Sequence, residues 1–460
     1  MEELGNLTKL RGRLVVRDLQ NVKDKEEAKK AKMFQKSKPQ ELTLYWDGDL
    51  RNSNDNHEDV LEGLKPHRKV KGLILRYFGG RRLASWMSTT DALLLLNLVK
   101  INQANFRLCE QVPVLGHLPH LAMVKMVRLH NLKRIGPEFY GPDEGIIDNC
   151  SSSGAAARVF PALREFQRFD MPQLEEWSDV SSLPVVGTRM LEFFPHLQKL
   201  DISKCPKLIT IPAFNGLTSL QHLEIERCPE FSSLPKELLQ PTLVDIRLKW
   251  CPKLKTPNLE ALRGLTSLKN LTVEECPILW SYWEEGLVCT TNLQSLHIGE
   301  FTEKLRFFPW PSPSAASSPW CHFTSLKYLV LVGWAEVRSL PDQLEHLSAL
   351  TSLKLQHFSG LESLPEWLGN LSSLQSLEVH ECPLLEERCE EGGEDWHKIA
   401  HIASIQIVNL FFEFLSLPLS LSLSQVSMFL FSMCVREIIN GKCYLTFVII
   451  GLSDSWDRFY

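Results

Sequence analysis

The sequence lacks an excess of charge of either sign. Its 460 residues carry 50 Lys and Arg against 55 Asp and Glu, which gives a formal net charge of −5. No stripe of basic residues runs along the chain, although such a stripe is the usual electrostatic footprint of a protein that binds nucleic acid. We therefore expect no nucleic-acid partner.

Motifs that position catalytic or ligand-binding groups are also missing. H-E-x-x-H, G-x-S-x-G, paired C-x-x-C and the phosphate-binding loop G-x-x-x-x-G-K-[ST] are all absent. The best zinc candidate consists of Cys382, Cys389, His397 and His401, but its spacing does not fit a zinc finger. We therefore expect no enzymatic activity, no cofactor and no metal.

The chain has little that indicates export. Met1-Glu2-Glu3 begins acidic and is not followed by the apolar core of a secretory signal. Twelve cysteines in 460 residues are too few for a disulfide scaffold. Five of them precede proline at recurring positions, namely Cys205, Cys228, Cys251, Cys276 and Cys382. We predict reduced thiols at one repeated structural position, and a cytoplasmic protein.

Leucine, in contrast, is abundant, with 76 of the 460 residues. Many leucines fall in the motif L-x-x-L-x-L, in which Ile or Val can replace Leu. The eight clearest copies begin at Leu197, Leu220, Leu243, Leu268, Leu293, Leu326, Leu350 and Leu374. Their starts are 23, 23, 25, 25, 33, 24 and 24 residues apart. This is the leucine-rich-repeat pattern.

The motif itself predicts the architecture. Its last two apolar residues lie two apart, so both point inward from one short strand while the residues between them face solvent. Stacked copies bury each other's apolar faces. The sequence therefore predicts an α/β solenoid, a leucine-rich-repeat horseshoe with a parallel β-sheet on its concave face and loops or short helices on its convex face.

Looser copies extend the pattern in both directions. We expect about fourteen repeats over residues 1–409, looser over 1–190 and regular over 191–409. The further strands are predicted at Leu10–Val16, Leu42–Trp46, Val70–Leu75, Leu98–Ile101, Leu121–Met126 and Leu163–Phe166, with a closing strand at Ile402–Ile407. The segment Lys23–Lys38 is predicted to be a convex-side helix with a solvated basic face rather than a basic binding site.

Residues 410–460 depart from the repeat text. They are apolar and rich in Leu and Ser, with Glu413 and Pro418 among them. Strict Leu-Ser alternation is also what a CT dinucleotide repeat encodes, so we favour read-through of untranslated sequence. A membrane segment within 410–434 is the alternative, because about 20 apolar residues suffice to span a bilayer.

Binding is the chemistry that the repeats favour. Solvent-facing positions on neighbouring strands form columns of mixed charge with an aromatic residue, a composition typical of protein–protein contacts. The alternative for any one of these residues is an ordinary solvated sheet face. The candidate protein-binding residues are Asp201, Glu224, Glu226, Arg227, Arg247, Lys249, Trp250, Glu274 and His297.

Several segments together resemble the leucine-rich-repeat region of plant intracellular immune receptors, the coiled-coil nucleotide-binding leucine-rich-repeat disease resistance proteins. The resemblance covers roughly residues 1–409. It is carried by Leu4–Gly12, Leu19–Val22, Glu27–Ala31, Leu42–Trp46, Val60–His67, Val112–Leu121, Ile135–Gly141, Phe160–Leu163, Leu174–Trp177 and Glu394–Ile402.

The resemblance implies a protein-recognition role. In that family the repeats would recognise a pathogen effector or a guarded host protein and would hold a nucleotide-binding switch domain inactive. Because the phosphate-binding loop is absent, ATP or ADP binding does not carry over, and contact with a nucleotide-binding domain would have to occur in trans. The alternatives are a truncated, non-signalling gene product and a stand-alone repeat protein that binds without receptor function.

Overall fold

The computed structural model describes residues 1–47, 56–88, 95–141, 157–178, 191–255, 263–279, 290–299, 323–333, 336–411, 430–439 and 442–451. The chain forms two compact units, Met1–Leu268 and Lys269–Tyr460, here called unit 1 and unit 2.

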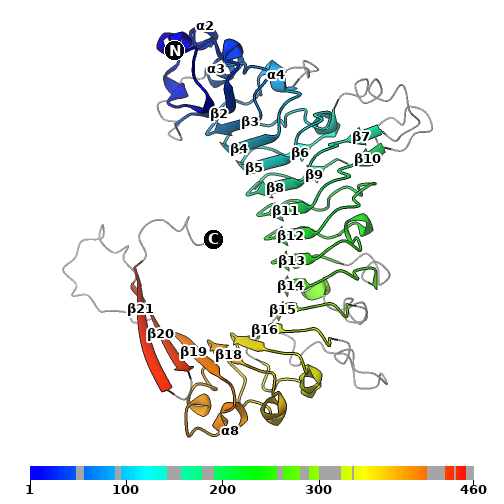
Figure 1. Ribbon diagram of the computed structural model, residues 1–460, viewed down its shortest axis with the longest axis vertical. Coiled ribbons are helices and arrows are strands. Elements are labelled where there is room, and N and C mark those ends of the chain that lie inside the picture. Colours follow the sequence, from blue (N-terminus) through cyan, green and yellow to red (C-terminus); the bar gives the residue numbers. More distant parts are fainter. Residues whose placement is uncertain are drawn as a thin grey trace, which may run out of the picture. The chain divides into compact units, whose positions relative to one another are not determined.

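Unit 1 is built on a parallel sheet, whose strands lie side by side in Figure 1. The strands that the structure describes are β1 (Gly12–Val16), β2 (Pro39–Tyr45), β3 (Gly72–Arg76), β4 (Lys100–Phe106), β5 (Met123–Leu129), β8 (Glu165–Phe169), β11 (Lys199–Ser203), β12 (His222–Glu226) and β13 (Asp245–Lys249). Equivalent residues of successive repeats are in register, so Leu200 is opposite Leu223 and Leu223 is opposite Ile246.

Short elements connect these strands. The helices are α1 (Glu2–Asn6), α2 (Lys25–Lys29), α3 (His57–Gly63) and α4 (Ser85–Ser88), and the 3-10 helices are η1 (Leu19–Asn21), η2 (Met33–Gln35), η5 (Pro137–Tyr140) and η7 (Lys236–Leu238). The structure also contains two short pairs of parallel strands in connections where only loops or helices were predicted. They are β6 (Arg134–Ile135) with β9 (Glu176–Trp177), and β7 (Ala157–Val159) with β10 (Leu191–Phe193).

The inward positions of the repeat motif form the core. Leu200, Ile202, Leu223 and Ile225 expose at most 1 % of their surface, and burying each such side chain contributes about 1.5–3 kcal/mol. The five cysteines that precede proline, namely Cys205, Cys228, Cys251, Cys276 and Cys382, are buried just beyond their strands. The thiol of Cys228, for example, donates to the backbone oxygen of Glu226 at 3.4 Å. The predicted role of this recurring position is confirmed.

An aromatic cluster fills the core where the leucine pattern is loosest. The rings of Phe160 and Phe194 stack with centroids 4.8 Å apart, and Phe214 meets Phe194 edge-on at 4.9 Å. Phe139 contacts Phe160 at 4.9 Å. Large rings occupy more volume than leucine, so this cluster accounts for the weaker leucine periodicity of these repeats.

The prediction of one helix over Lys23–Lys38 is wrong. The segment contains α2 and then the separate η2, because Lys32 between them adopts the left-handed conformation with φ 49°. Met33 is buried there, whereas Phe34 is 57 % exposed. Lys36 is also buried, and its ammonium donates to the backbone oxygens of Leu4 and Leu7 at 2.7 and 2.9 Å.

Unit 2 continues the same design. Its described parallel strands are β14 (Asn270–Glu274), β15 (Ser295–Gly299), β16 (Tyr328–Val332), β17 (Ser352–Gln356), β18 (Ser376–His380) and β19 (Ser404–Phe411). Its described helical turns include η9 (Asp342–His346), η10 (Glu366–Asn370), η11 (Glu387–Cys389) and α8 (Trp396–Ile399).

The prediction that the strand at Ile402–Ile407 closes the sheet is wrong. β19 pairs on its other side with β20 (Leu430–Ile439), and β20 pairs with β21 (Lys442–Gly451), both in antiparallel register. No helix within the described residues is long and apolar enough to cross a membrane. Residues 412–429, 440–441 and 452–460 of the tail lie outside the described residues, and the origin of 410–460 stays a prediction.

Both units therefore confirm the predicted fold class, a leucine-rich-repeat solenoid built on parallel strands. The sequence also predicts loops between repeats at residues 148–157 and 311–319, and these lie almost entirely outside the described residues.

Candidate protein-binding surface

The strand surface of unit 1 is defined here by the side chains of β11, β12 and β13 that alternate with the inward Leu and Ile residues. All are at least partly exposed except Ser203, which is only 2 % exposed. They form three columns, because each residue is opposite its equivalent on the next strand. The columns are Lys199, His222 and Asp245; Asp201, Glu224 and Arg247; and Ser203, Glu226 and Lys249. The last two columns contain five of the predicted site residues in the predicted arrangement.

Opposite charges meet on this surface, between columns as well as within one. The Arg247 guanidinium contacts the Asp245 carboxylate at 3.1 Å, and the Nδ1 of His222 lies 3.7 Å from the same carboxylate. Together with Lys199, Leu223 and Glu224, these three side chains line a hollow of about 310 Å³. The hollow is shallow and charged, so it suits a polar side chain of a protein partner better than an apolar small molecule.

The carboxylate of Glu224 lines this hollow, and its pKa is shifted from the ordinary value. Partial burial raises its pKa, and the neighbouring charge of Asp201 acts in the same direction. The nearby cations Arg247 and Lys199 oppose the shift. A further cation supplied by a partner would favour the ionised carboxylate, so Glu224 is suited to meet a basic side chain.

Trp250, Arg227 and Lys249 form the aromatic edge of this surface. The Arg227 guanidinium lies 4.7 Å from the Trp250 ring centroid and the Lys249 ammonium lies 5.7 Å from it. Arg227 also contacts Glu226 at 3.5 Å. Trp250 is 36 % exposed, so a large ring held by two cations faces solvent beside the charged columns. Trp and Arg are the residue types enriched at the energetic centres of protein interfaces.

The backbone explains how these edge residues are presented. Lys204, Arg227 and Trp250 all adopt the left-handed conformation, with φ of 55°, 54° and 51°. The conformation costs about 1 kcal/mol or more for a residue with a side chain. It lets the amides of Lys204 and Arg227 donate to the next repeat at 2.8 and 2.9 Å before the chain turns inward to the cysteine.

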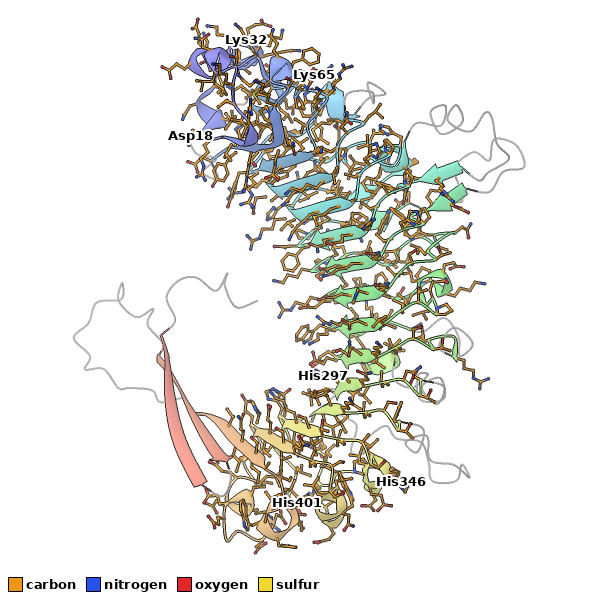
Figure 2. The ribbon with its side chains drawn as sticks, viewed as in Figure 1. Asp18, Lys32, Lys65, His297, His346 and His401 are labelled. Atoms are coloured by element: carbon orange, nitrogen blue, oxygen red, sulfur yellow. The ribbon has the colours of Figure 1, made fainter. Side chains whose placement is uncertain are left out.

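The remaining predicted residues, Glu274 and His297, belong to unit 2. They lie on neighbouring strands, contact each other through the His297 Nε2 and the Glu274 carboxylate, and expose only 22 % (His297) and 13 % (Glu274) of their side chains. Figure 2 shows His297 on the strand side of unit 2, whereas His346 lies on the side of the helical turns. A partner would reach this pair only through a small exposed area.

Three lining residues were missed by the sequence analysis, namely Lys199, His222 and Asp245. They occupy the solvent-facing position just before the first inward leucine of each strand, whereas only the two later positions were considered. The period-two alternation of a strand predicts that this earlier position faces solvent as well, so the signal was available.

The repeated strands, inward leucines and buried cysteines define a leucine-rich-repeat protein. Comparison with known proteins supports a more specific likeness. Residues 1–129 match the family described as R13L1/DRL21 LRRs. The chain is 30% identical over 223 residues to the putative disease resistance RPP13-like protein 1 of Arabidopsis thaliana, a match over 46% of this chain and 20% of that protein.

A second relative, the disease resistance protein RGA2 of Solanum bulbocastanum, is 30% identical over 220 residues, or 47% of this chain and 21% of that protein. A solved structure, the Leptospira interrogans LRR protein LIC12759, matches with a TM-score of 0.40 at 17% identity, over 82% of this chain and 86% of that one. The resemblance to the leucine-rich repeats of plant disease resistance proteins is thus confirmed. The match spans about a fifth of each plant relative.

Proposed function

We propose that this chain is a protein-recognition module of plant disease resistance, whose partner is a pathogen effector or a guarded host protein. In the same proposal, it restrains a nucleotide-binding switch domain until that partner arrives. The likeness to disease resistance proteins supports the setting. The observation that carries the binding role is the strand surface of unit 1, with its exposed Trp250 held between Arg227 and Lys249.

The chemistry of that surface favours binding over catalysis. Its charged groups are spread over three strands and face solvent, and its hollow is open. Mixed charges around an aromatic anchor provide orientation and affinity for a protein surface. A partner of complementary charge would place basic groups against Glu224 and acidic groups against Arg247 and Lys249.

The test compares two double variants of matched charge change. In Arg247→Glu with Lys249→Glu, the strand surface is altered. In Lys207→Glu with Lys253→Glu, two lysines in the turns after the cysteines are altered instead. Both make exposed ion pairs, with Glu175 and Glu230, and Lys207 also donates to the exposed Gln173 side chain at 2.6 Å. Both are expected to keep the wild-type melting temperature to within a few degrees, because exposed ion pairs are worth about 0–1 kcal/mol.

Quantitative affinity capture from plant tissue is then made with the wild type and both variants. We expect one or more proteins to be enriched by the wild type and the turn variant, and to be lost with the strand-surface variant. The proposed binding role is wrong if the strand-surface variant captures the same proteins to the same extent. Restraint of the switch domain is tested separately, by co-expressing each variant with a nucleotide-binding domain from a relative and measuring nucleotide exchange.

A further inference from the structure

A second hollow lies in unit 1, beside the N-terminal ends of the parallel strands. It measures about 460 Å³ and is lined by residues that precede β5, β8, β11 and β12: His120, Ala122, Pro161, Ala162, Arg164, His196, Gln198 and Ser219. None of these residues belongs to the strand surface, so this hollow is a separate feature of the same unit.

The lining arises from one turn that recurs in the sequence. Pro119-His120-Leu121, Pro161-Ala162-Leu163 and Pro195-His196-Leu197 each enter a strand. The leucine of each turn is at most 1 % exposed, so the residue before it faces outward. The backbone nitrogen of Arg164 donates to Ala122 at 2.9 Å and that of Gln198 donates to Arg164 at 2.8 Å. These bonds align the three turns one strand spacing apart, about 4.8 Å.

The charge of the lining is of one sign. Arg164 is a permanent cation, the lining also includes the imidazoles of His120 and His196, and none of the described lining residues carries a carboxylate. Arg164, His120, His196 and Gln198 are exposed, and in the described part of the chain their side chains make no hydrogen bond or ion pair. The strand surface differs, because Arg247 there is already paired with Asp245 at 3.1 Å.

Small residues also line the hollow. Ala122 and Ala162 carry no polar side-chain group, so they do not compete with the N–H donors for a ligand. Ser219 lines the hollow as well, and its hydroxyl donates to the backbone oxygen of Pro195 at 3.0 Å. The hollow thus combines side-chain N–H donors that make no hydrogen bond among the described residues with two alanines that leave space beside them.

We propose that this hollow binds an acidic segment of a protein partner, one that carries adjacent carboxylates or a phosphorylated side chain. The Arg164 guanidinium makes paired hydrogen bonds to the anionic group, since its planar fork matches two oxygens at once. The N–H groups of His120, His196 and Gln198 complete the shell. This site is independent of the strand surface and would contact a different part of a partner, or a different partner.

The test is fluorescence anisotropy with the full chain and a labelled peptide that contains four consecutive aspartates. The matched probe has asparagines in their place, and a third probe carries one phosphoserine. Arg164→Gln removes the permanent cation of the hollow. Arg134→Gln is the control, because it removes the same charge from an exposed residue of β6 that belongs neither to this hollow nor to the strand surface.

We expect the aspartate and phosphoserine peptides to bind and the asparagine peptide to bind at least about tenfold more weakly. Arg164→Gln should lower the affinity about tenfold, as expected for loss of a charge-assisted paired hydrogen bond, with the melting temperature unchanged. Arg134→Gln should stay within about twofold of the wild type, and inorganic phosphate should compete only at far higher concentration than the phosphoserine peptide.

Three results would overturn the proposal: no binding of either acidic peptide, equal binding of the asparagine peptide, or an equal loss in Arg134→Gln. If free phosphate competes as well as the phosphoserine peptide, the hollow is an anion site and not a peptide site. None of these results depends on the partner of the strand surface.

Discussion

The carboxylate of Asp395 lies 2.9 Å from the ammonium nitrogen of Lys398, and both side chains are buried, with 0 % and 8 % of their surface exposed. The same carboxylate accepts hydrogen bonds from the Arg388 Nε at 2.9 Å and the Leu364 backbone nitrogen at 3.0 Å. Lys398 in turn donates to the Leu364 backbone oxygen at 2.6 Å. The segment Glu394–Ile402, noted in the sequence only for its resemblance, thus ties the last turns of unit 2 to the preceding repeat.

Replacing the carboxylate should destabilise unit 2 strongly. Asp395→Asn leaves two cations facing a neutral amide in a buried site, and breaking a buried pair in this way costs about 3–5 kcal/mol. Chemical denaturation followed by fluorescence measures the change. Glu394→Gln is the control, since Glu394 is 75% exposed and also contacts Arg388; we expect it to cost under about 1 kcal/mol. Equal losses in the two variants would contradict this account.

The same pair predicts a dependence on pH. Burial acts to raise the pKa of Asp395, but the hydrogen bonds from Arg388, Lys398 and the Leu364 amide outweigh it and hold that pKa below its ordinary value. A depressed carboxyl pKa contributes stability above the unfolded value of about 3.9, and this contribution is lost as pH falls through the folded value. The difference in unfolding free energy between wild type and Asp395→Asn should therefore be constant near neutral pH and shrink below about pH 4. A difference that persists undiminished at pH 2 would refute the assignment.

Replacing Arg168 by an apolar side chain of similar length should stabilise the protein. It occupies an inward position of β8, is 0 % exposed, and its three guanidinium nitrogens have no hydrogen-bond partner among the described residues. Burial lowers the pKa of Arg168, although the guanidinium stacks on Trp177 at 4.0 Å. Exchange of a buried charge for an apolar side chain of similar length is neutral or stabilising by about 1–4 kcal/mol.

We therefore expect Arg168→Met to raise the melting temperature, as measured by differential scanning calorimetry. Met126, on the neighbouring strand at the equivalent position, offers the matched comparison: Met126→Leu should change stability by less than about 1.5 kcal/mol. A clear loss of stability in Arg168→Met would show that the stacking on Trp177 outweighs the cost of burial.

The buried thiols should resist alkylation in the folded chain. Burial raises the pKa of Cys109 and Cys382 to about 11, and burial together with the charge of Asp395 raises that of Cys389 to about 12. Thiolates are the reactive form, so iodoacetamide at pH 8 should leave these three cysteines unmodified until urea unfolds the chain. Peptide mass spectrometry identifies the modified sites. Modification of Cys382 in the native protein at the rate of a free thiol would show that its repeat opens locally.

Much of the arrangement of residues on the strand surface could be predicted from the repeat pattern. The motif sets which residues point inward, and the constant repeat length brings Asp201, Glu224 and Arg247 into one column, as predicted. It also places Cys205 and Cys228 at one buried position. These features depend on strand periodicity and on a fixed number of residues per turn, both of which are local properties of the chain.

The sequence by itself determined the leucine-rich-repeat fold, the inward rows and the columns of the strand surface. Tertiary structure alone decided which of Met33 and Phe34 is buried, that Arg168 lies within the core, and that Asp395 meets Leu364 across 31 residues of sequence. It also decided that His120, Arg164 and His196 line one hollow. The physical reason is that a repeat pattern indicates only which face of a strand is apolar. Contacts between turns depend on how the irregular connections pack against one another, and those connections differ from one repeat to the next.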